Sequence, residues 1–326
     1  MAIAYWGRKS KEYMQEILKL YPMEEVDTVV DACMGSGSFS ENVSCQLTNV
    51  KCIGIELDRG IYILHKVIKE QYEELLDKMI TCNYNEEFYF ECRRKTREFN
   101  HGKGEYSEVE IALAELVILF FSYNGMRGNT PRRFDSYKKH QGAEKKKNEM
   151  KLKNVYDRFF MRAPGNIVSI HSKWQRLHLI YGSFMDYKEF WENPKAWIFI
   201  DPPYELSKRG IEEHRIKDGV YLGYDCDMCL EEHDKFINAL YHYYRENRLQ
   251  AKMMICTNYE LDESGKMHIP ANDRYSKLLD IGFVRMTIQN KACSNMYYST
   301  EEKGEGTKKR RHRKIEVVYI NYRTIL

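Results

Sequence analysis

The chain has 326 residues, of which 43% are hydrophobic and 30% charged, and its formal net charge is +3. This balance excludes an intrinsically disordered chain, and the length suits one large or two modest domains. No apolar run reaches the roughly 18–20 residues that cross a bilayer, and the N-terminus lacks the apolar segment of a secretory signal. The nine cysteines have no framework spacing, so we expect reduced thiols, a cytoplasmic location and no membrane contact.

The first predicted elements are a strand, a glycine-rich turn, a helix and a second strand. Residues 26–30 form an apolar, β-branched run, and after the turn a helix begins near Ser38. A second apolar run covers 50–55, and Asp58 then suits the N-cap of a helix whose apolar residues recur at helical spacing as far as Met79. This order is typical of the opening of a doubly wound α/β domain.

The middle of the chain, residues 82–166, has a helical pattern over 109–123 and little strand character. The α/β pattern then resumes in three strand-like runs, at residues 177–181, 197–200 and 253–256. The sequence therefore predicts an α/β domain made of residues 1–81 and 167–326. A mainly helical domain, residues 82–166, interrupts it.

Two segments of the chain concentrate basic charge. Residues 127–153 hold ten Lys and Arg against three acids, and residues 303–314 hold seven against one, which leaves the rest of the chain at −10. The second segment connects strand-like runs at 283–289 and 315–322, so a C-terminal β-hairpin would carry it near a loop tip. An acidic body with two basic segments favours contact with a polyanion, while two solvated loops are the plain alternative.

The glycine-rich turn is the first candidate for ligand binding. Gly35 and Gly37 lie where a strand turns into a helix, and their missing Cβ atoms let backbone amides approach a ligand. Glu56 ends the next strand, where an acid can accept hydrogen bonds from ribose hydroxyls. Ser40 stands at the third position of the dinucleotide fingerprint, which therefore fails. The turn and the acid favour an adenosine-containing ligand without choosing among such ligands.

A sharper feature is the segment Asp201-Pro202-Pro203-Tyr204, which follows a predicted strand at the end where open α/β sheets bind ligands. Its two prolines fix φ and remove two donors, which leaves a rigid backbone with free carbonyls. A carboxylate and such carbonyls can accept both hydrogens of an exocyclic amine, and the tyrosine ring can stack on a flipped base. The structural alternative is a stiff turn that ends a strand.

In this order along the chain, the motifs resemble those of the Dam-type DNA adenine-N6 methyltransferases. The family's aromatic-x-Gly-Gly-Lys opening is similar to residues 5–9, and its Asp-Pro-Pro-Tyr is intact. Its Asn-Gly-x-Arg segment resembles residues 124–127, and its Asp-Phe pair resembles residues 183–184. The Glu-His pair at residues 232–233 also resembles a later segment of the family. The resemblance implies a Rossmann-like S-adenosylmethionine-dependent methyltransferase sheet, an inserted helical target-recognition domain and a C-terminal β-hairpin.

The resemblance also implies S-adenosylmethionine as the cofactor, duplex DNA as the partner and no metal. It assigns catalysis to Asp201, Pro202, Pro203 and Tyr204. It assigns cofactor binding to Tyr5, Trp6, Gly7, Lys9, Asp31, Ala32, Gly35, Gly37, Phe39, Glu56, Ser183, Phe184 and Asp201. The candidates for DNA contact are Asn124, Arg127, Arg132, Arg133, Lys138, Lys139, Lys308, Lys309, Arg310 and Arg311. We expect most of these to contact phosphates. A separately encoded restriction endonuclease is a further candidate partner.

The chain departs from the family pattern at four places. Arg8 replaces the second glycine of the opening motif, and Ser183 replaces an Asp that would accept from the adenine amine. Glu56 stands for an Asp, which is a mild change. The basic segment carries only Arg-Phe-Asp, residues 133–135, in place of Asn-Val-Pro-Phe-Gly. These departures concern the cofactor contact and the recognised DNA sequence more than the reaction.

The chemistry of the residues agrees with an amino-methyltransferase. Cytosine-C5 enzymes of the usual kind need a cysteine after a proline, and none of the seven prolines precedes Cys. Cytosine-N4 enzymes more often have Ser before the two prolines, so Asp201 favours adenine. The alternatives that stay open are an RNA or cytosine-N4 methyltransferase on the same fold and a catalytically impaired DNA-binding subunit. A dehydrogenase is a more distant alternative, because the third fingerprint glycine is missing.

Overall fold

The computed structural model describes residues 9, 11–122, 156–203, 216–217, 220–221, 228, 230–261, 266–271, 273–288, 297–300 and 309–324. The protein is a mixed α/β structure that divides into two compact units. Unit 1 comprises Met1–Arg8, Cys33–Asp186 and Leu206–Asp227, and unit 2 comprises Lys9–Ala32, Tyr187–Glu205 and Met228–Leu326. Each unit contains part of the predicted site.

Unit 2 is built on a sheet whose central strands are parallel. The parallel strands, in spatial order, are β1 (Thr28–Asp31), β4 (Ala196–Ile200) and β7 (Lys252–Leu261). The antiparallel strands are β8 (Met267–His268), β9 (Val284–Ile288), β10 (Tyr297–Thr300) and β11 (Lys309–Ile320). All five residues of β4 are buried, as expected for an apolar strand in the middle of a parallel sheet.

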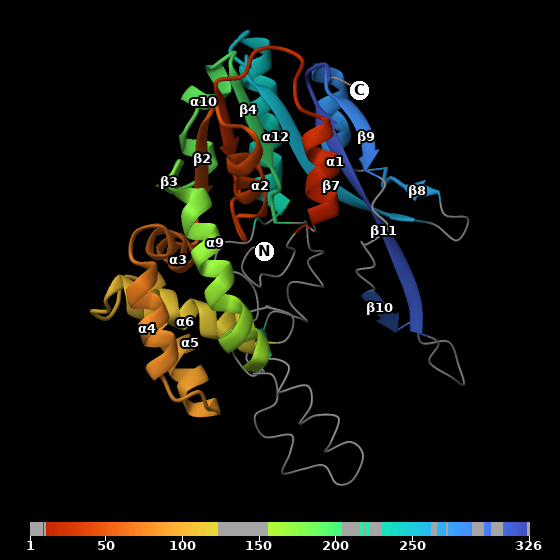
Figure 1. Cartoon of the computed structure of the whole chain (residues 1–326). Helices are drawn as coiled ribbons and strands as arrows, with labels where there is room; N and C mark the ends of the chain where they lie inside the picture. The colour runs from red at the N-terminus through yellow and green to blue at the C-terminus, as the bar shows by residue number, and fades with distance from the viewer. Residues whose placement is uncertain are drawn as a thin grey trace. The chain divides into compact units, whose positions relative to one another are not determined.

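Strand β11 joins the antiparallel part of the sheet. It pairs along one edge with β7 and along the other with β9, so that Val318 lies opposite both Cys256 and Met286. Its first residues, Lys309 to His312, pair with β10, and Figure 1 shows this part of β11 as a long blue extension. The described residues of unit 2 include the helices α1 (Lys11–Lys19), α10 (Glu189–Glu192) and α12 (Leu230–Arg245) and the 3₁₀ segment η4 (Tyr275–Ile281).

Unit 1 begins with the glycine-rich turn and holds two parallel strands, β2 (Lys51–Glu56) and β3 (Leu177–Tyr181). The early helices are α2 (Ser38–Gln46), α3 (Arg59–Glu70) and α4 (Tyr72–Thr81). The later helical segments are α5 (Glu86–Asn100), α6 (Glu108–Phe121), η2 (Arg158–Arg162), α9 (Ala163–Trp174) and η3 (Phe184–Asp186). A two-stranded ribbon, β5 (Ile216–Lys217) and β6 (Val220–Tyr221), completes its described residues.

Helix α6 is the apolar centre of the helical part of unit 1. Eleven of its fourteen residues are buried, and it packs against α3, α4 and α5, drawn in orange and yellow in Figure 1. Ser107 and Glu110 begin it with a capping box, in which each side chain accepts from the other residue's backbone N–H. The helix predicted from residues 109–123 is therefore present, with a local start signal at Ser107.

Two helical features differ from the sequence expectation. The single helix predicted from Asp58 to Met79 is wrong, because Gln71 adopts φ −139° and ψ 33° and divides it into α3 and α4. Helix α5 was not predicted, because most of its residues are polar and its apolar pattern is weak. Its buried residues are Tyr89, Cys92 and Thr96. Among the described residues, no helix combines the length and the apolar character needed to cross a membrane.

Candidate functional site

The glycine-rich turn of unit 1 requires glycine for two separate reasons. Gly35 and Gly37 have φ of 48° and 69°, the left-handed region that side chains disfavour. Gly37 also lies against α9, where an added Cβ would approach Trp174 Cζ2 to 2.5 Å. The turn therefore brings the chain to the start of α2 with backbone N–H groups free of Cβ shielding.

Glu56 connects this turn to the start of α3. It ends β2 and is buried, and its Oε2 accepts a hydrogen bond of 2.7 Å from the Gly35 backbone N–H. Its Oε1 accepts one of 2.8 Å from the Asp58 N–H, and Asp58 in turn caps α3 by accepting from Ile61 N. Because charge-assisted hydrogen bonds are stronger than neutral ones, the carboxylate holds both loops in place.

His65 holds the other side of the same peptide. It is fully buried on α3, and its Nε2 lies 2.8 Å from the Gly35 carbonyl oxygen, which makes Nε2–H the donor. Burial lowers the pKa of His65 to about 4, so the ring is neutral near pH 7. The ring meets Trp174 edge to face, with centroids 4.9 Å apart. Sequence reasoning missed His65, whose only signal is a histidine on the apolar face of a helix.

For the remaining described cofactor candidates, the structure gives burial and local contacts. Phe39 is buried on α2, and Phe184 is buried at the start of η3. Ser183 precedes it, and its hydroxyl accepts from the Met185 N–H at 3.2 Å, so this residue closes a short turn after β3. Asp31 and Ala32 are buried in unit 2, in and after β1.

Asp201 lies directly after β4, in unit 2, and is followed by a buried Pro202. The ammonium of Lys9 lies 3.3 Å from Asp201 Oδ1 and 3.0 Å from Glu316 Oε2 on β11. The side chains of Lys9 and Glu316 are 7% and 8% exposed, and that of Asp201 is 19% exposed. One cation thus contacts two carboxylates at the carboxyl end of a parallel strand, where open α/β sheets place their chemistry.

A second histidine lies near this corner. His233 on α12 is buried, and its Nδ1 lies 2.6 Å from the Tyr275 hydroxyl. Burial and the charge of Arg274 lower the pKa of His233 to about 4, against a smaller raising effect of the Pro203 carbonyl. The imidazole is therefore neutral near pH 7 and faces the backbone of the Pro-Pro turn.

A comparison with protein families identifies the family of this chain. The family model for D12 class N6 adenine-specific DNA methyltransferases matches residues 5–257. The chain belongs to this family. The predicted family and the predicted reaction class, DNA adenine methylation, are confirmed. A search of the curated proteins found no significant match.

The structure of this methyltransferase brings the predicted residues together in two groups. Unit 1 assembles Gly35, Gly37 and Glu56, and unit 2 assembles Lys9 and Asp201. Several predicted residues lie outside the described residues: Tyr5, Trp6, Gly7, Tyr204, Asn124, Arg127, Arg132, Arg133, Lys138, Lys139 and Lys308. The backbones of Lys309, Arg310 and Arg311 lie in β11 and pair with β10.

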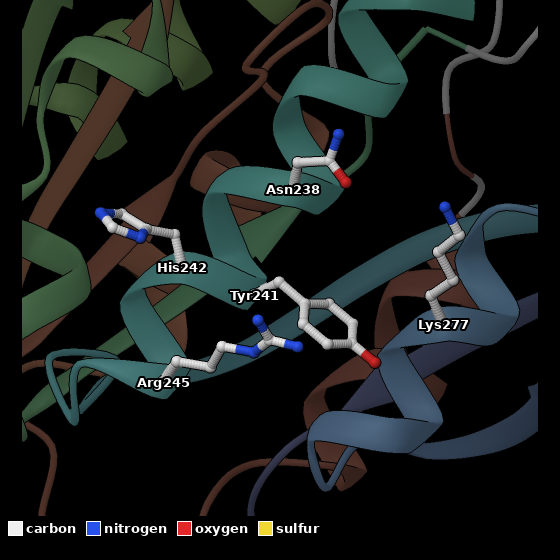
Figure 2. A pocket seen from close by; sticks show the side chains of 5 residues that line it. All are labelled: Asn238, Tyr241, His242, Arg245 and Lys277. Atoms are coloured by element: carbon white, nitrogen blue, oxygen red, sulfur yellow. The ribbon is translucent and has the colours of Figure 1, made fainter.

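The methyltransferase also has a surface hollow that contains no predicted site residue. A surface hollow of about 370 Å³ between α12 and η4 is lined by Asn238, Tyr241, His242, Arg245 and Lys277 (Figure 2). Its Tyr241 hydroxyl donates to Asp280, and none of its lining residues belongs to the predicted site. Within the described part of the chain, no three potential ligand side chains gather as a metal site would require.

Proposed function

We propose that this DNA adenine methyltransferase transfers the methyl group of S-adenosylmethionine to N6 of an adenine flipped out of duplex DNA. The observation that carries the proposal is the placement of Asp201 after β4, held by Lys9 and followed by two prolines. A carboxylate at this position, with rigid carbonyls beside it, suits an exocyclic amine better than any other group of a base.

The turn in unit 1 fits the adenosine part of the cofactor. Glycines with positive φ precede the N-terminus of α2, where backbone N–H groups can face a ligand. Each oxygen of Glu56 accepts one backbone N–H, and since a carboxylate oxygen can accept more than one hydrogen bond, a ribose hydroxyl can also donate to it. We assign cofactor binding to this turn, together with Ser183 and Phe184. When bound, S-adenosylmethionine supplies an electrophilic methyl group on a sulfonium.

Asp201 acts on the nucleophile. The adenine amine reacts poorly because its lone pair is conjugated with the ring. By accepting one amine hydrogen, with the Pro202 carbonyl accepting the other, Asp201 shifts the nitrogen toward tetrahedral geometry and frees the lone pair. The N–C bond would then form as the C–S bond of the sulfonium breaks, the neutral thioether would leave, and the extra proton of N6 would pass to solvent. This requires mainly positioning and no covalent enzyme intermediate. Tyr204 supplies the ring on which the flipped base stacks, and flipping costs a few kcal/mol.

DNA binding is assigned to the two basic segments. Their net charges of +7 over residues 127–153 and +6 over residues 303–314 suit a phosphate backbone. We propose that residues 82–166 form the target-recognition domain within the Rossmann-like catalytic domain of residues 1–81 and 167–326. The C-terminal β-hairpin then presents Lys308 to Arg311 to the duplex. A separately encoded restriction endonuclease is the candidate functional partner.

The test is methyl transfer from labelled S-adenosylmethionine to mixed-sequence duplex DNA, with nucleoside analysis of the product. We expect N6-methyladenine from the wild type and none above background from Asp201→Ala, since its carboxylate is the proposed acceptor. Glu108→Gln, which removes an ion pair with Lys66 in unit 1, is the matched control and keeps full activity. Methylated cytosine, or methylation of RNA and not DNA, would contradict the proposal. Full activity of Asp201→Ala would contradict the catalytic assignment.

A further inference from the structure

Glu316 is a buried carboxylate beside an apolar run of the sheet. It lies on β11 between β7 and β9, opposite Asn258 and Ile288, and the next four residues are all buried. Burying an ionised carboxylate is unfavourable unless a partner compensates it, and well-packed apolar residues usually serve stability equally well. A buried acid at this position therefore points to a role in the site.

The contacts of Glu316 lead to the proposed catalytic acid through one cation. Lys9 Nζ lies 3.0 Å from Glu316 Oε2 and 3.3 Å from Asp201 Oδ1, and it also lies 5.0 Å from the centre of the Tyr13 ring. The Tyr13 hydroxyl in turn contacts Cys256 Sγ at 3.7 Å. These groups come from four separate segments of unit 2: Asp201, Glu316 and the Tyr13 ring contact the ammonium, and Cys256 adjoins it through Tyr13.

The contacts of Lys9 bring two carboxylates to one ammonium. Burial raises the pKa of Cys256 well above its ordinary value, and the Asp201 carboxylate adds to this effect, so the thiol is neutral. Lys9 then faces two carboxylates. If Lys9 faced Asp201 alone, the two would form a neutral pair that competes with the amine hydrogen for the carboxylate. With Glu316 present, the ammonium is shared, because its three hydrogens can bind several acceptors.

We propose that Glu316 is a positioning residue, which holds the Lys9 ammonium between two carboxylates so that Asp201 stays an available acceptor for the target amine. This inference rests on the proposed role of Asp201. It assigns a function to the C-terminal strand, since Glu316 lies beyond the residues that the family model matches. Lys9 thereby serves the acceptor side of the reaction, in addition to the cofactor contact predicted from the sequence.

The experiment measures the single-turnover rate of methyl transfer at saturating S-adenosylmethionine and DNA, beside the dissociation constant of each. We expect Glu316→Gln to lower the rate on the order of 10- to 100-fold, as loss of positioning does. Both dissociation constants stay within about 3-fold of the wild type, because Glu316 acts on the acceptor and not on binding. Glu316→Asp keeps the charge and recovers part of the rate. Glu108→Gln is the matched control and leaves the rate unchanged.

A double-mutant cycle separates a path through Lys9 from a general effect on the fold. Lys9→Met lowers the rate by itself, and adding Glu316→Gln to it lowers the rate by less than about 2-fold further. Rates are divided by the fraction of protein that binds S-adenosylmethionine, so partial misfolding of one variant does not hide the result. The double variant removes both members of the Lys9–Glu316 pair, so Glu316 is not left buried without its cation, while Asp201 loses Lys9 equally in the single and the double variant.

Three outcomes overturn the inference. A wild-type rate in Glu316→Gln shows that the carboxylate does not act on the reaction. Equal losses in rate and in both dissociation constants, without recovery in Glu316→Asp, show a purely structural role. Additive losses in the cycle show that Lys9 does not connect the two acids. If Asp201→Ala is also fully active, the proposed function has failed; if only Glu316→Gln is active, the failure belongs to this inference.

Discussion

The two groups of candidate residues, one in each unit, are held in different ways. In unit 1, Gly35 is held by Glu56 at its N–H and by His65 at its carbonyl, from 21 and 30 positions further along the chain. The corner in unit 2 joins residues 307 positions apart, because Lys9 contacts both Asp201 and Glu316. The first arrangement depends mainly on the backbone geometry of the glycines, and the second on buried charge. The proposed cofactor-binding turn is therefore the steric half of this comparison, and the proposed acceptor corner is its electrostatic half.

The largest expected effect tests the electrostatic half. Asp201→Asn keeps the shape of the side chain and removes its charge, so we expect the methyl-transfer rate to fall by about 100-fold or more. Cofactor affinity changes by less than about 10-fold, because the turn in unit 1 is intact. The measurement pairs single-turnover kinetics with isothermal titration of S-adenosylmethionine. Equal losses in the methyl-transfer rate and in the affinity for S-adenosylmethionine would show that the two groups of residues do not act separately.

Gly37→Ala tests the steric half. The substitution places a Cβ on a residue in the left-handed region, 2.5 Å from Trp174. We therefore expect the free energy of unfolding to fall by about 3 kcal/mol and the affinity for the cofactor to fall as well. Gly102→Ala is the matched control, because Gly102 has the same φ of 69° and nothing within 4 Å of the added atom. That control costs about 1 kcal/mol and leaves affinity unchanged. Denaturant unfolding measures both, and equal costs would show that contact with Trp174 is unimportant.

The pH dependence of stability reports on His65. Its pKa is about 4 in the folded protein and about 6.5 when unfolded, so the unfolded state binds more protons between these values. The resulting stability is present above pH 6.5 and is lost as the pH falls toward 4, by up to about 3 kcal/mol. His65→Gln removes this contribution and keeps an N–H donor for Gly35.

His233 contributes to the same pH window, because its pKa is also lowered to about 4. Unfolding at pH 7.5 and at pH 4.5 is therefore compared in the wild type, in His65→Gln and in His233→Gln. Each variant is expected to lose part of the pH dependence. If both single variants keep the wild-type dependence, folding does not lower the pKa of either imidazole.

The smallest effect concerns a residue that belongs to neither half. Ser107→Ala removes the cap of α6 and is expected to cost about 1 kcal/mol, because the Glu110 N–H loses its side-chain acceptor. Neither the methyl-transfer rate nor cofactor affinity changes. Thermal unfolding and the kinetic assay measure the two quantities. A change in rate would show that the helices around α6 are coupled to the site.

The sequence predicted the regular elements wherever one local signal was sufficient. The strand at 177–181 has the predicted bounds, and Asp58 caps its helix as expected, because an apolar run and a cap need no distant partner. The break at Gln71 was missed, since apolar spacing continues across it. Strand β7 extends to Leu261, beyond the predicted run, because β11 and β8 supply its pairing partners.

By itself, the sequence determined the family, the reaction class and the two motifs, since these depend on residue types in a fixed order along the chain. The glycines at the strand-to-helix turn and the acid at Glu56 also follow from local spacing, whereas the positive φ of Gly35 and Gly37 is seen only in the structure. Only the tertiary structure decided that Glu316, at the other end of the chain, contacts Lys9, and that His65 holds the carbonyl of Gly35. The physical reason is that a buried charge or imidazole takes its role from the groups that folding places around it, and no local pattern specifies these neighbours.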